Sequence, residues 1–240
     1  MNKEDLLKQY PYKIELHLHS MPASACCHCS MERTLEIYSE RNIDAICLTN
    51  HFYKNNNIFL NKSKSECIET YLSDYERLKK LAEPYGIKIL LGCEIRFTEN
   101  TNDYLIYGVN KSILEEAFDY FDFGLENYRK NVMLKDSVFI QAHPFRDNIT
   151  LADSALVDGF ETLNFHNTHN NRNAACAFFA KNNGISICTG GSDFHHDRMY
   201  HPVTCIMLSK ELPTDSFELA KLIKSRDYIF LLGNNHIIVP

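Results

Sequence analysis

The sequence predicts an α/β fold built on a largely parallel sheet, either open or closed into a barrel. Short apolar runs that suit strands alternate with segments whose apolar residues recur at helical spacing. Alternation of this kind places helices on the faces of a parallel sheet. The 240 residues hold about six or seven strand–helix units, whereas a full eight-unit barrel usually needs about 250 residues. We therefore expect one domain over residues 1–240, with a barrel of fewer than eight units.

Strands are expected where apolar residues run together between turn signals, at 12–18, 44–48, 87–97, 104–109, 137–142, 159–163, 185–188 and 203–208. Helices are expected where the apolar spacing follows the helical period, at 31–41, 67–82, 112–118, 125–134, 173–181 and 215–225. Pro84 and Gly86 end the longest helix. The Asn-rich stretch 54–61 is expected to be a polar loop.

Composition and charge narrow the class of protein. Apolar residues make up 45% of the chain and aromatic residues 12%, as in a globular protein rather than a disordered one. The net charge of −6 and the lack of Lys/Arg clusters disfavour binding to long nucleic acids. No apolar run approaches the roughly 18 residues that a membrane span needs, and the charged N-terminus does not resemble a signal peptide. We expect a cytoplasmic protein without a membrane partner.

The nine cysteines are odd in number and scattered along the chain. Several lie in apolar, strand-like runs: Cys47, Cys93, Cys188 and Cys205. Buried reduced thiols explain these positions better than disulfides do, which agrees with a cytoplasmic protein.

The clearest chemical signal is the segment Glu15-Leu16-His17-Leu18-His19. Side chains alternate along a strand, so His17 and His19 are expected on one face and the two leucines on the other. Imidazoles that share a face at the carboxyl end of a strand can chelate one metal ion. The alternative is a pair of buried, hydrogen-bonded histidines without a metal.

Other predicted strand ends carry the same types of residue, namely His51, Glu94, His143 and the pair Asp193 and His195. Each has an alternative explanation, such as a loop histidine, or a pairing of Glu94 with Arg96 or a lysine. In a parallel barrel, however, the carboxyl ends of the strands converge on one face, where active sites form. Mixed imidazole and carboxylate ligands suit Zn, Mn or Fe. The sequence therefore predicts a metal-dependent hydrolase.

These segments resemble the PHP (polymerase and histidinol phosphatase) superfamily over residues 14 to about 200. The matching motifs are His17-Leu18-His19, Thr49-Asn50-His51, Gly92-Cys93-Glu94, His143-Pro144 and Ser192-Asp193-Phe194-His195. The stretches 94–97, 102–105, 143–146 and 158–161 look like those of one branch of small stand-alone PHP proteins. The resemblance implies a distorted (β/α)7 TIM-like barrel, two or three divalent metal ions (Zn, Mn or Fe) and phosphoester hydrolysis, like that of histidinol phosphatase.

The resemblance also implies roles for the individual residues. Glu94 would bridge two metal ions, and His17, His19 and Asp193 would complete one centre. His143 would hold the second ion, and His51 and His195 would belong to a third centre or to leaving-group chemistry. Glu94, Asp193 and His195 are accordingly the candidate catalytic residues.

The sequence departs from the family pattern at three places. Asn50 replaces the usual Asp of the second motif, and a neutral amide can hydrogen-bond but adds no charge. The family often has a His shortly after the first motif, where this chain has Cys26-Cys27-His28-Cys29, so His28 or Cys26 is a possible substitute ligand. The chain has no His between His51 and His143, which leaves one ligand position vacant or filled from elsewhere, with His166 as a candidate.

Three residues are candidates for contact with substrate. Arg146 could pair bidentately with a phosphate, although a surface salt bridge is the alternative. His166 and Arg172 lie in the polar stretch 164–173, which could line a pocket or merely cap the next helix. His196 and His201 are expected behind the ligands or on the surface.

Three functions compete. The leading hypothesis is hydrolysis of a small phosphomonoester. The alternatives are a phosphodiesterase or nuclease acting on nucleotides or oligonucleotide ends, and a non-catalytic metal-binding regulatory protein. An amidohydrolase-type hydrolase is disfavoured, because no Lys stands at a comparable strand end.

Overall fold

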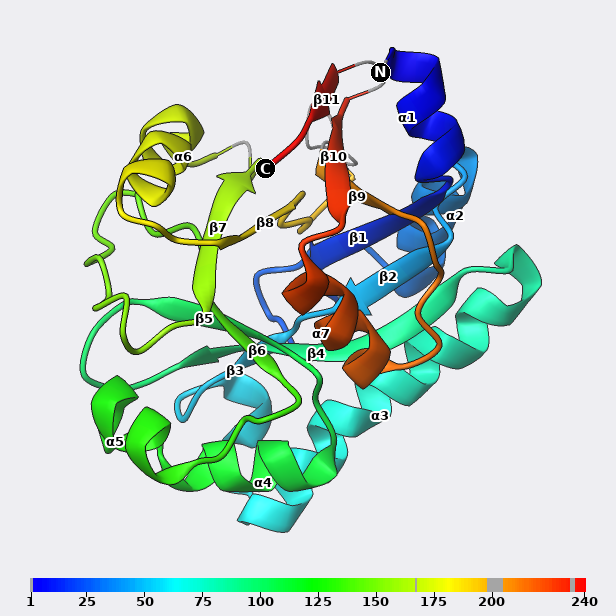
Figure 1. Ribbon diagram of the computed structural model, residues 1–240. Coiled ribbons are helices and arrows are strands. Elements are labelled where there is room, and N and C mark those ends of the chain that lie inside the picture. Colours follow the sequence, from blue (N-terminus) through cyan, green and yellow to red (C-terminus); the bar gives the residue numbers. More distant parts are fainter. Residues whose placement is uncertain (1, 167, 198–204, 234–235) are drawn as a thin grey trace.

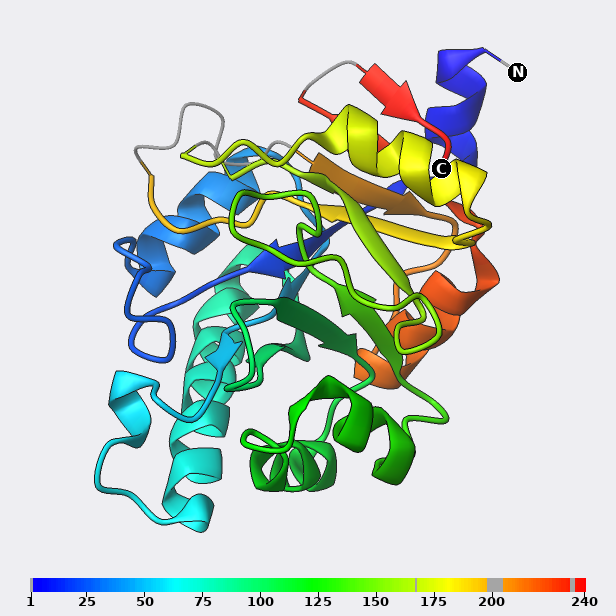
Figure 2. The same ribbon diagram turned by 90° about the vertical axis from the view of Figure 1, so that its left-hand side faces the viewer.

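The computed structural model describes residues 2–166, 168–197, 205–233 and 236–240, which form a curled sheet with helices packed around it (Figures 1 and 2). The strands are β1 (Tyr12–Leu18), β2 (Ala45–Leu48), β3 (His51–Phe52), β4 (Lys88–Arg96), β5 (Asp103–Tyr107), β6 (Val138–Gln141), β7 (Gly159–Asn164), β8 (Ile187–Gly191), β9 (Cys205–Ser209), β10 (Tyr228–Leu232) and β11 (His236–Ile238). The helices are α1 (Lys3–Gln9), α2 (Met31–Glu40), α3 (Lys64–Ala82), α4 (Lys111–Asp119), α5 (Gly124–Asn131), α6 (Asn173–Asn182) and α7 (Ser216–Ser225), with 3₁₀ turns at Asn57–Phe59 and Glu83–Tyr85.

The sheet is mixed rather than largely parallel. Its order is β11-β10-β9-β1-β2-β4-β5-β6-β7-β8, with β3 paired to β4. The pairs β1–β2, β2–β4, β3–β4, β6–β7 and β7–β8 are parallel. The pairs β4–β5 and β5–β6 and those that join β1, β9, β10 and β11 are antiparallel. The expectation of a largely parallel sheet was wrong, because β5 follows β4 without the helical crossover that a parallel pair needs.

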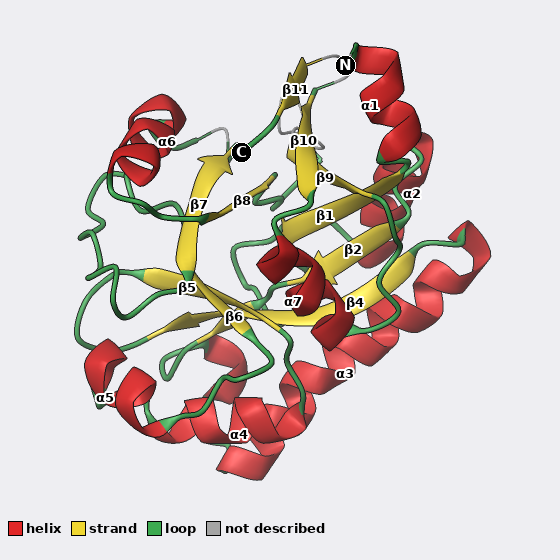
Figure 3. Ribbon diagram, in the orientation of Figure 1, coloured by secondary structure: helices red, strands yellow, loops and turns green. Residues whose placement is uncertain are grey.

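The sheet curls until the segment after β8 reaches β1. Phe194 forms a single parallel bridge with Leu18, and the His19 N–H donates to the Phe194 carbonyl at 3.2 Å. The fold is therefore α/β with a strongly curled sheet, as Figure 3 shows. A regular (β/α)7 barrel is not confirmed, because reversals interrupt the strand–helix alternation and, among the described residues, the edge strand β8 pairs with β7 only, while a single bridge joins the segment just after it to β1.

Helix α7 fills the inside of the curl. Its buried residues Leu219, Ala220 and Ile223 belong to the same apolar cluster as Leu16 and Tyr107 of the surrounding strands. At its first residue, the Ser216 hydroxyl accepts from the backbone N–H groups of residues 108 and 109, which follow β5. Since β5 runs antiparallel to β4 and β6, its end lies opposite the carboxyl ends of those strands. The helix thus closes one end of the curl and leaves the other end open.

Helices α2 and α3 cover the outer face of β1, β2 and β4 (Figure 1). Ser63 and Glu66 form a capping box that starts α3 at Lys64, three residues before the position that apolar spacing predicted. The capping residues determine where the helix starts, whereas the spacing of apolar residues indicates only where its buried face begins, at Cys67.

The side chains of β1 do not alternate regularly between the two faces of the sheet. Its pairing with β2 is irregular between Glu15 and Leu18, as expected for a β-bulge. Leu16 consequently packs in the inner cluster and Leu18 in the outer one. The prediction that both leucines share a face was wrong, because the bulge shifts the alternation within the motif.

Several elements were not predicted, namely α1, β3, β10 and β11. The cysteines agree with the expectation of reduced thiols, since all nine are free and only Cys26 and Cys188 are not buried. Among the described residues, no helix combines the length and the apolar character that crossing a bilayer requires.

Candidate metal centre

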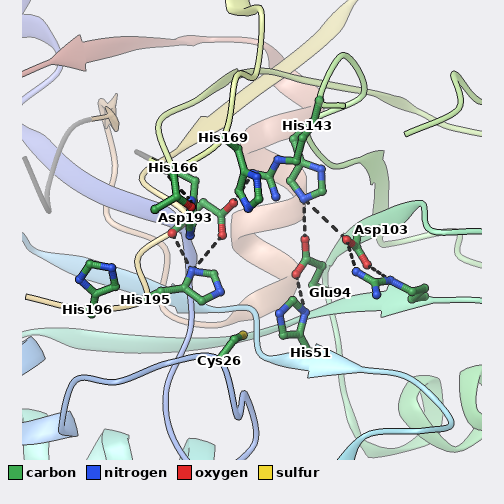
Figure 4. Close-up of a pocket in the computed structure, with 13 residues that line it drawn as sticks. Cys26, His51, Glu94, Asp103, His143, His166, His169, Asp193, His195 and His196 are labelled. Atoms are coloured by element: carbon green, nitrogen blue, oxygen red, sulfur yellow. Dashed lines mark hydrogen bonds and ion pairs between the residues drawn. The ribbon is translucent and has the colours of Figure 1, made fainter. Parts of the chain in front are cut away.

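The open end of the curl holds a cavity of about 370 Å³ lined by polar side chains (Figure 4). Its lining comprises Cys26, His51, Glu94, Arg96, Asp103, His143, Arg146, His166, Thr168, His169, Asp193, His195 and His196. Most of these residues lie at or just beyond the carboxyl ends of strands, as the sequence predicted. His17 and His19, both fully buried, lie directly against Glu94 and Asp193.

The two histidines of the first motif converge despite the bulge. Their Nε2 atoms lie 3.1 Å apart. Each Nε2 is 3.4 Å from an oxygen of Glu94, and the Oδ1 atom of Asp193 lies 3.5 Å from the Nε2 of His17 and 3.4 Å from that of His19. Two imidazole nitrogens and two carboxylates therefore surround one point, with the donor set that a Zn, Mn or Fe ion accepts.

Glu94 lies between His51 and His143 (Figure 4). Its Oε2 atom is 2.8 Å from the Nδ1 of His51, and its Oε1 atom is 3.2 Å from the Nε2 of His143. Glu94 has only 1% of its surface exposed. A carboxylate at this position can reach ions on either side, as the family resemblance implies for a bridging ligand.

The hydrogen bonding of these atoms fits a metal site. The Nδ1 atom of His51 and the Oε2 atom of Glu94 are buried but have no hydrogen-bond partner, despite their close approach. Unpartnered buried polar atoms are costly unless a ligand completes them. Three groups have ligand atoms within 4.8 Å of one another: His17, His19 and Glu94; His51, Glu94 and Asp103; and His19, His51 and His195. The groups share members, so they do not define three independent sites.

The Nδ1 atoms of His17 and His19 are engaged in hydrogen bonds, so the two Nε2 atoms, 3.1 Å apart, are the ring nitrogens that would face a ligand. The Nδ1 of His17 donates to the Oε1 of Glu161 at 2.8 Å, and the Nδ1 of His19 donates to the Ser24 hydroxyl at 3.0 Å. That hydroxyl in turn donates to the Oδ1 of Asn50 at 2.9 Å. Such partners fix the ring orientation and the tautomer of a ligating histidine.

Asn50 therefore acts on the neighbourhood of His19 rather than on the ring of His51. Its Oδ1 also accepts from the Ser20 N–H at 2.7 Å, and its amide donates to the Ser20 hydroxyl at 3.0 Å. Asn50 reaches His51 only indirectly, through the Ser24 hydroxyl, which accepts from the His51 backbone N–H. A neutral amide satisfies all of these bonds.

The charges in the site are strongly coupled. Burial disfavours the ionised Glu94, but His17 and His51 hold the pKa of its carboxyl well below the usual range. Burial likewise opposes the charged form of His17, yet Glu161, Asp193 and Glu94 raise its pKa well above the usual value. Burial and the neighbouring histidines lower the pKa of His19 well below the usual value. These opposite shifts favour a protonated His17 beside a neutral His19, and a metal ion bound at this point would displace the proton.

Arg146 reaches into the pocket rather than forming a surface salt bridge. Its guanidinium contacts the Oδ2 of Asp193 at 2.6 Å. It also donates to the side-chain oxygens of Asn164 at 3.0 Å and Asn171 at 2.8 Å. Only 13% of the arginine side chain is exposed. These contacts hold a cation at the wall of the candidate metal centre.

Several predicted residues lie elsewhere. Arg172 is outside the pocket lining, because it pairs with Asp147 and donates to the Phe145 carbonyl. His28 is exposed, and only its backbone N–H reaches the site, donating to the His195 carbonyl. Cys26 lines the pocket instead. Although burial opposes it, hydrogen bonds with His195 and His51 lower the pKa of the Cys26 thiol to about 6.

The sequence also singled out His166, His196 and His201. His166 and His196 line the pocket, but His166 is in none of the groups that could hold an ion. Its ring lies 4.8 Å from the ring of His195, and burial lowers its pKa to about 3. His201 lies outside the described residues.

Two candidate ligands have strained backbones. His143 has a φ of 31° and Asp193 a φ of 50°, in the left-handed region that non-glycine residues rarely adopt. Such strain persists where the surrounding structure over-determines it, and it clusters at functional sites. At His143, the backbone N–H donates to the Oε2 of Glu161 at 3.0 Å, which holds the strained turn in place.

Sequence reasoning missed the roles of Glu161 and Asp103. Glu161 stands inside an apolar strand and is 1% exposed, the same signal that identified Glu94. Asp103 opens β5, and because β5 is antiparallel its first residue lies at the mouth that holds the carboxyl ends of its neighbours. No pattern within the sequence reveals that reversal.

Comparison with known proteins agrees with this geometry. A family model described as the PHP domain matches residues 15–224. The chain belongs to the PHP domain family. No curated protein matches the sequence, but solved structures share the PHP-like fold.

PsfC from Pseudomonas syringae PB-5123 superposes with a TM-score of 0.64 at 15% identity, covering 93% of this chain and 92% of PsfC. A two-domain protein from Bacteroides vulgatus ATCC 8482 contains a predicted PHP-like metal-dependent phosphoesterase. It superposes with a TM-score of 0.61 at 14% identity, covering 92% of this chain and 65% of the two-domain protein. A proposed metal-dependent phosphoesterase from Bifidobacterium adolescentis ATCC 15703 superposes with a TM-score of 0.52 at 13% identity, covering 88% of this chain and 95% of that protein. At these identities the likenesses concern the fold.

Proposed function

We propose that this PHP protein is a metal-dependent phosphoesterase that acts on a small phosphomonoester. The observation that carries the proposal is the convergence of imidazole nitrogens and carboxylate oxygens around Glu94, with buried atoms that lack hydrogen-bond partners. The arginine beside this cluster supplies a fixed cation for an anionic substrate. Two of the similar solved structures add support, since one contains a predicted PHP-like metal-dependent phosphoesterase and the other is a proposed metal-dependent phosphoesterase.

Glu94 would contribute to two metal centres. His17, His19 and Asp193 would hold one ion, and His143 with His51 would hold the other. A third ion near His195 would have to share His19 and His51 with the two centres. Bound divalent ions supply Lewis acidity and lower the pKa of water, so that hydroxide is available near neutral pH.

The residues of the chain prepare the site for a phosphoryl group. Asn164 and Asn171 orient the guanidinium of Arg146 toward the cavity wall, where it would pair with phosphoryl oxygens and stabilise the charge they carry in the transition state. The phosphoryl group would have to share Arg146 with Asp193. Binding of a metal ion by Asp193 would weaken that ion pair and make the arginine available to substrate.

The size and charge of the pocket favour a small substrate. A cavity of about 370 Å³ lies near the lower limit of ligand sites, which span roughly 300–1,000 Å³. The chain carries a net charge of −6, whereas binding along a nucleic-acid backbone depends on many cationic contacts. A monoester with its dianionic end at the metal centre fits these constraints better than a polymer does.

Hydrolysis of paired model substrates tests the proposal. Protein stripped with EDTA is reloaded with Mn²⁺, Zn²⁺ or Fe²⁺ and assayed with p-nitrophenyl phosphate and with bis(p-nitrophenyl) phosphate. We expect metal-dependent turnover, with kcat/KM at least about tenfold higher for the monoester, a difference of about 1.4 kcal/mol in activation free energy. Preference for the diester would favour a phosphodiesterase. Bound metal without turnover of either ester would favour a regulatory role.

A further inference from the structure

We propose that Asp103 is a metal ligand at the Glu94 centre, occupying the position left by the missing mid-chain histidine. This inference rests on the proposed metal dependence of the site. The first argument for it is topological. Asp103 is the first residue of β5 and pairs with Arg96 at the end of β4, while Glu94 pairs with Leu105. The reversal at β5 therefore delivers a carboxylate to the mouth where His51 and His143 lie.

The second argument is distance and burial. Asp103 is only 3% exposed and lines the cavity. Its ligand oxygen lies within 4.8 Å of those of His51 and Glu94, and its Oδ2 atom is 3.8 Å from the Nε2 of His143. A buried carboxylate beside the facing atoms of Glu94 and His51, which make no hydrogen bond, completes a set of two imidazoles and two carboxylates.

The third argument is the manner in which Arg96 holds Asp103. The Nε and Nη2 atoms of Arg96 donate to the two oxygens of Asp103, each at 2.7 Å. A carboxylate has about four lone-pair sites, so this fork leaves acceptor capacity on the side that faces the cavity (Figure 4). Arg96 thus orients Asp103 without using all of its lone pairs, as partners of metal ligands commonly do.

The replacement has a chemical consequence. A carboxylate in place of an imidazole makes the centre richer in oxygen, and harder oxygen ligands favour Mn²⁺ over Zn²⁺ relative to nitrogen ligands. The centre formed by Glu94, Asp103, His51 and His143 should therefore bind Mn²⁺ better, relative to Zn²⁺, than the same centre with a histidine at position 103.

The experiment measures metal binding rather than turnover. Metal-free protein is titrated with Mn²⁺, with free Mn²⁺ followed by electron paramagnetic resonance, and competition with Zn²⁺ gives the relative affinity. We expect Asp103→Asn to lose one bound Mn²⁺ per chain or to weaken one site by at least about tenfold to a hundredfold, the loss typical of residues that support a metal site. Asp103→His should bind an ion again but shift the preference toward Zn²⁺ by about tenfold.

Asp158→Asn is the matched control. Asp158 also pairs with an arginine, Arg129, at 3.1 Å, but it lies outside the cavity lining, so its variant should bind metal like the wild type. Circular dichroism checks folding, and Asp103→His carries the test if Asp103→Asn does not fold. Unchanged Mn²⁺ binding in Asp103→Asn, or unchanged metal preference in Asp103→His, would overturn the assignment of Asp103 alone. Failure of the wild type to bind any metal would overturn the proposed function as well.

Discussion

The Nδ1 atom of His17 lies 2.8 Å from the Oε1 atom of Glu161, two buried residues that are 144 positions apart in the chain. Glu161 also accepts the backbone N–H of His143 and the side-chain amide of Asn164. One carboxylate thus positions two candidate ligands, His17 and His143, that belong to different strands. The metal centre depends on this residue although it does not itself face the cavity.

Removing the charge of Glu161 should therefore weaken metal binding. In Glu161→Gln the amide cannot accept at both positions, so either His17 or the His143 backbone loses its partner. We expect metal affinity to fall by about 10- to 100-fold, measured by titration of the metal-free protein. Glu126→Gln, an exposed position in α5, is the control. Equal affinity in the two variants would show that Glu161 serves only the packing of the strand.

Arg146 and Arg172 provide a matched pair of arginine variants. Arg146 contacts Asp193 inside the cavity, whereas Arg172 pairs with Asp147 outside it. We expect Arg146→Ala to lower kcat/KM for a phosphomonoester by about a hundredfold, or roughly 3 kcal/mol of transition-state stabilisation. Arg172→Ala should change it little. If the two variants lose activity equally, the arginine in the pocket has no direct role with substrate.

The thiol of Cys26 should be unusually reactive in the metal-free protein. Hydrogen bonds with His195 and His51 lower its pKa to about 6 against the effect of burial, and the thiolate is the reactive form. The rate of alkylation by iodoacetamide should rise with pH through a midpoint at about 6 and level off above about pH 7, whereas an ordinary thiol would continue to gain reactivity up to about pH 9. Mass spectrometry of the modified peptide measures the rate, with Cys26→Ser as the control. A midpoint near that of a free cysteine would contradict the expectation.

Gly191 is required where β8 passes β1. A Cβ atom at this position would lie 2.4 Å from the Cβ of His17 and 2.9 Å from its backbone nitrogen. Gly191→Ala should lower the free energy of unfolding by about 1–3 kcal/mol, because the crowded strands must move apart. Urea unfolding of the metal-free protein measures the loss, and Ser186→Ala, just before the same strand, is the comparison. Equal stability of the two variants would mean that the strands separate there without strain.

The convergence of the candidate ligands could be predicted from the sequence better than the directions of the strands. His17, His51, Glu94, His143 and Asp193 come together because each lies near a strand end, and this placement is visible in the alternation of apolar and polar residues. The direction of each strand is not visible in that pattern. Apolar runs do not distinguish a parallel from an antiparallel neighbour, so the reversal at β5 was missed and Asp103 with it.

Contacts between loops that are distant in the chain could not be predicted from sequence patterns. Arg146 and Arg172 have similar settings in the chain, but only the structure shows that Asn164 and Asn171 turn the first into the cavity. The cysteine-rich segment after the first motif is a similar case. Its position near the site was anticipated, yet the turn of the backbone decides that Cys26, and not His28, lines the pocket.

Metal content of the purified protein tests the central claim most directly. Wild type, Asp193→Ala and the control Asp119→Ala, an exposed carboxylate that pairs with Lys64, are reconstituted with Mn²⁺ or Zn²⁺, desalted and analysed by mass spectrometry for metal. Hydrolysis of p-nitrophenyl phosphate is measured on the same samples. We predict two or more ions per chain and turnover in the wild type and the control, and loss of an ion and of turnover in Asp193→Ala. A wild-type protein that retains no metal after reconstitution would contradict the account.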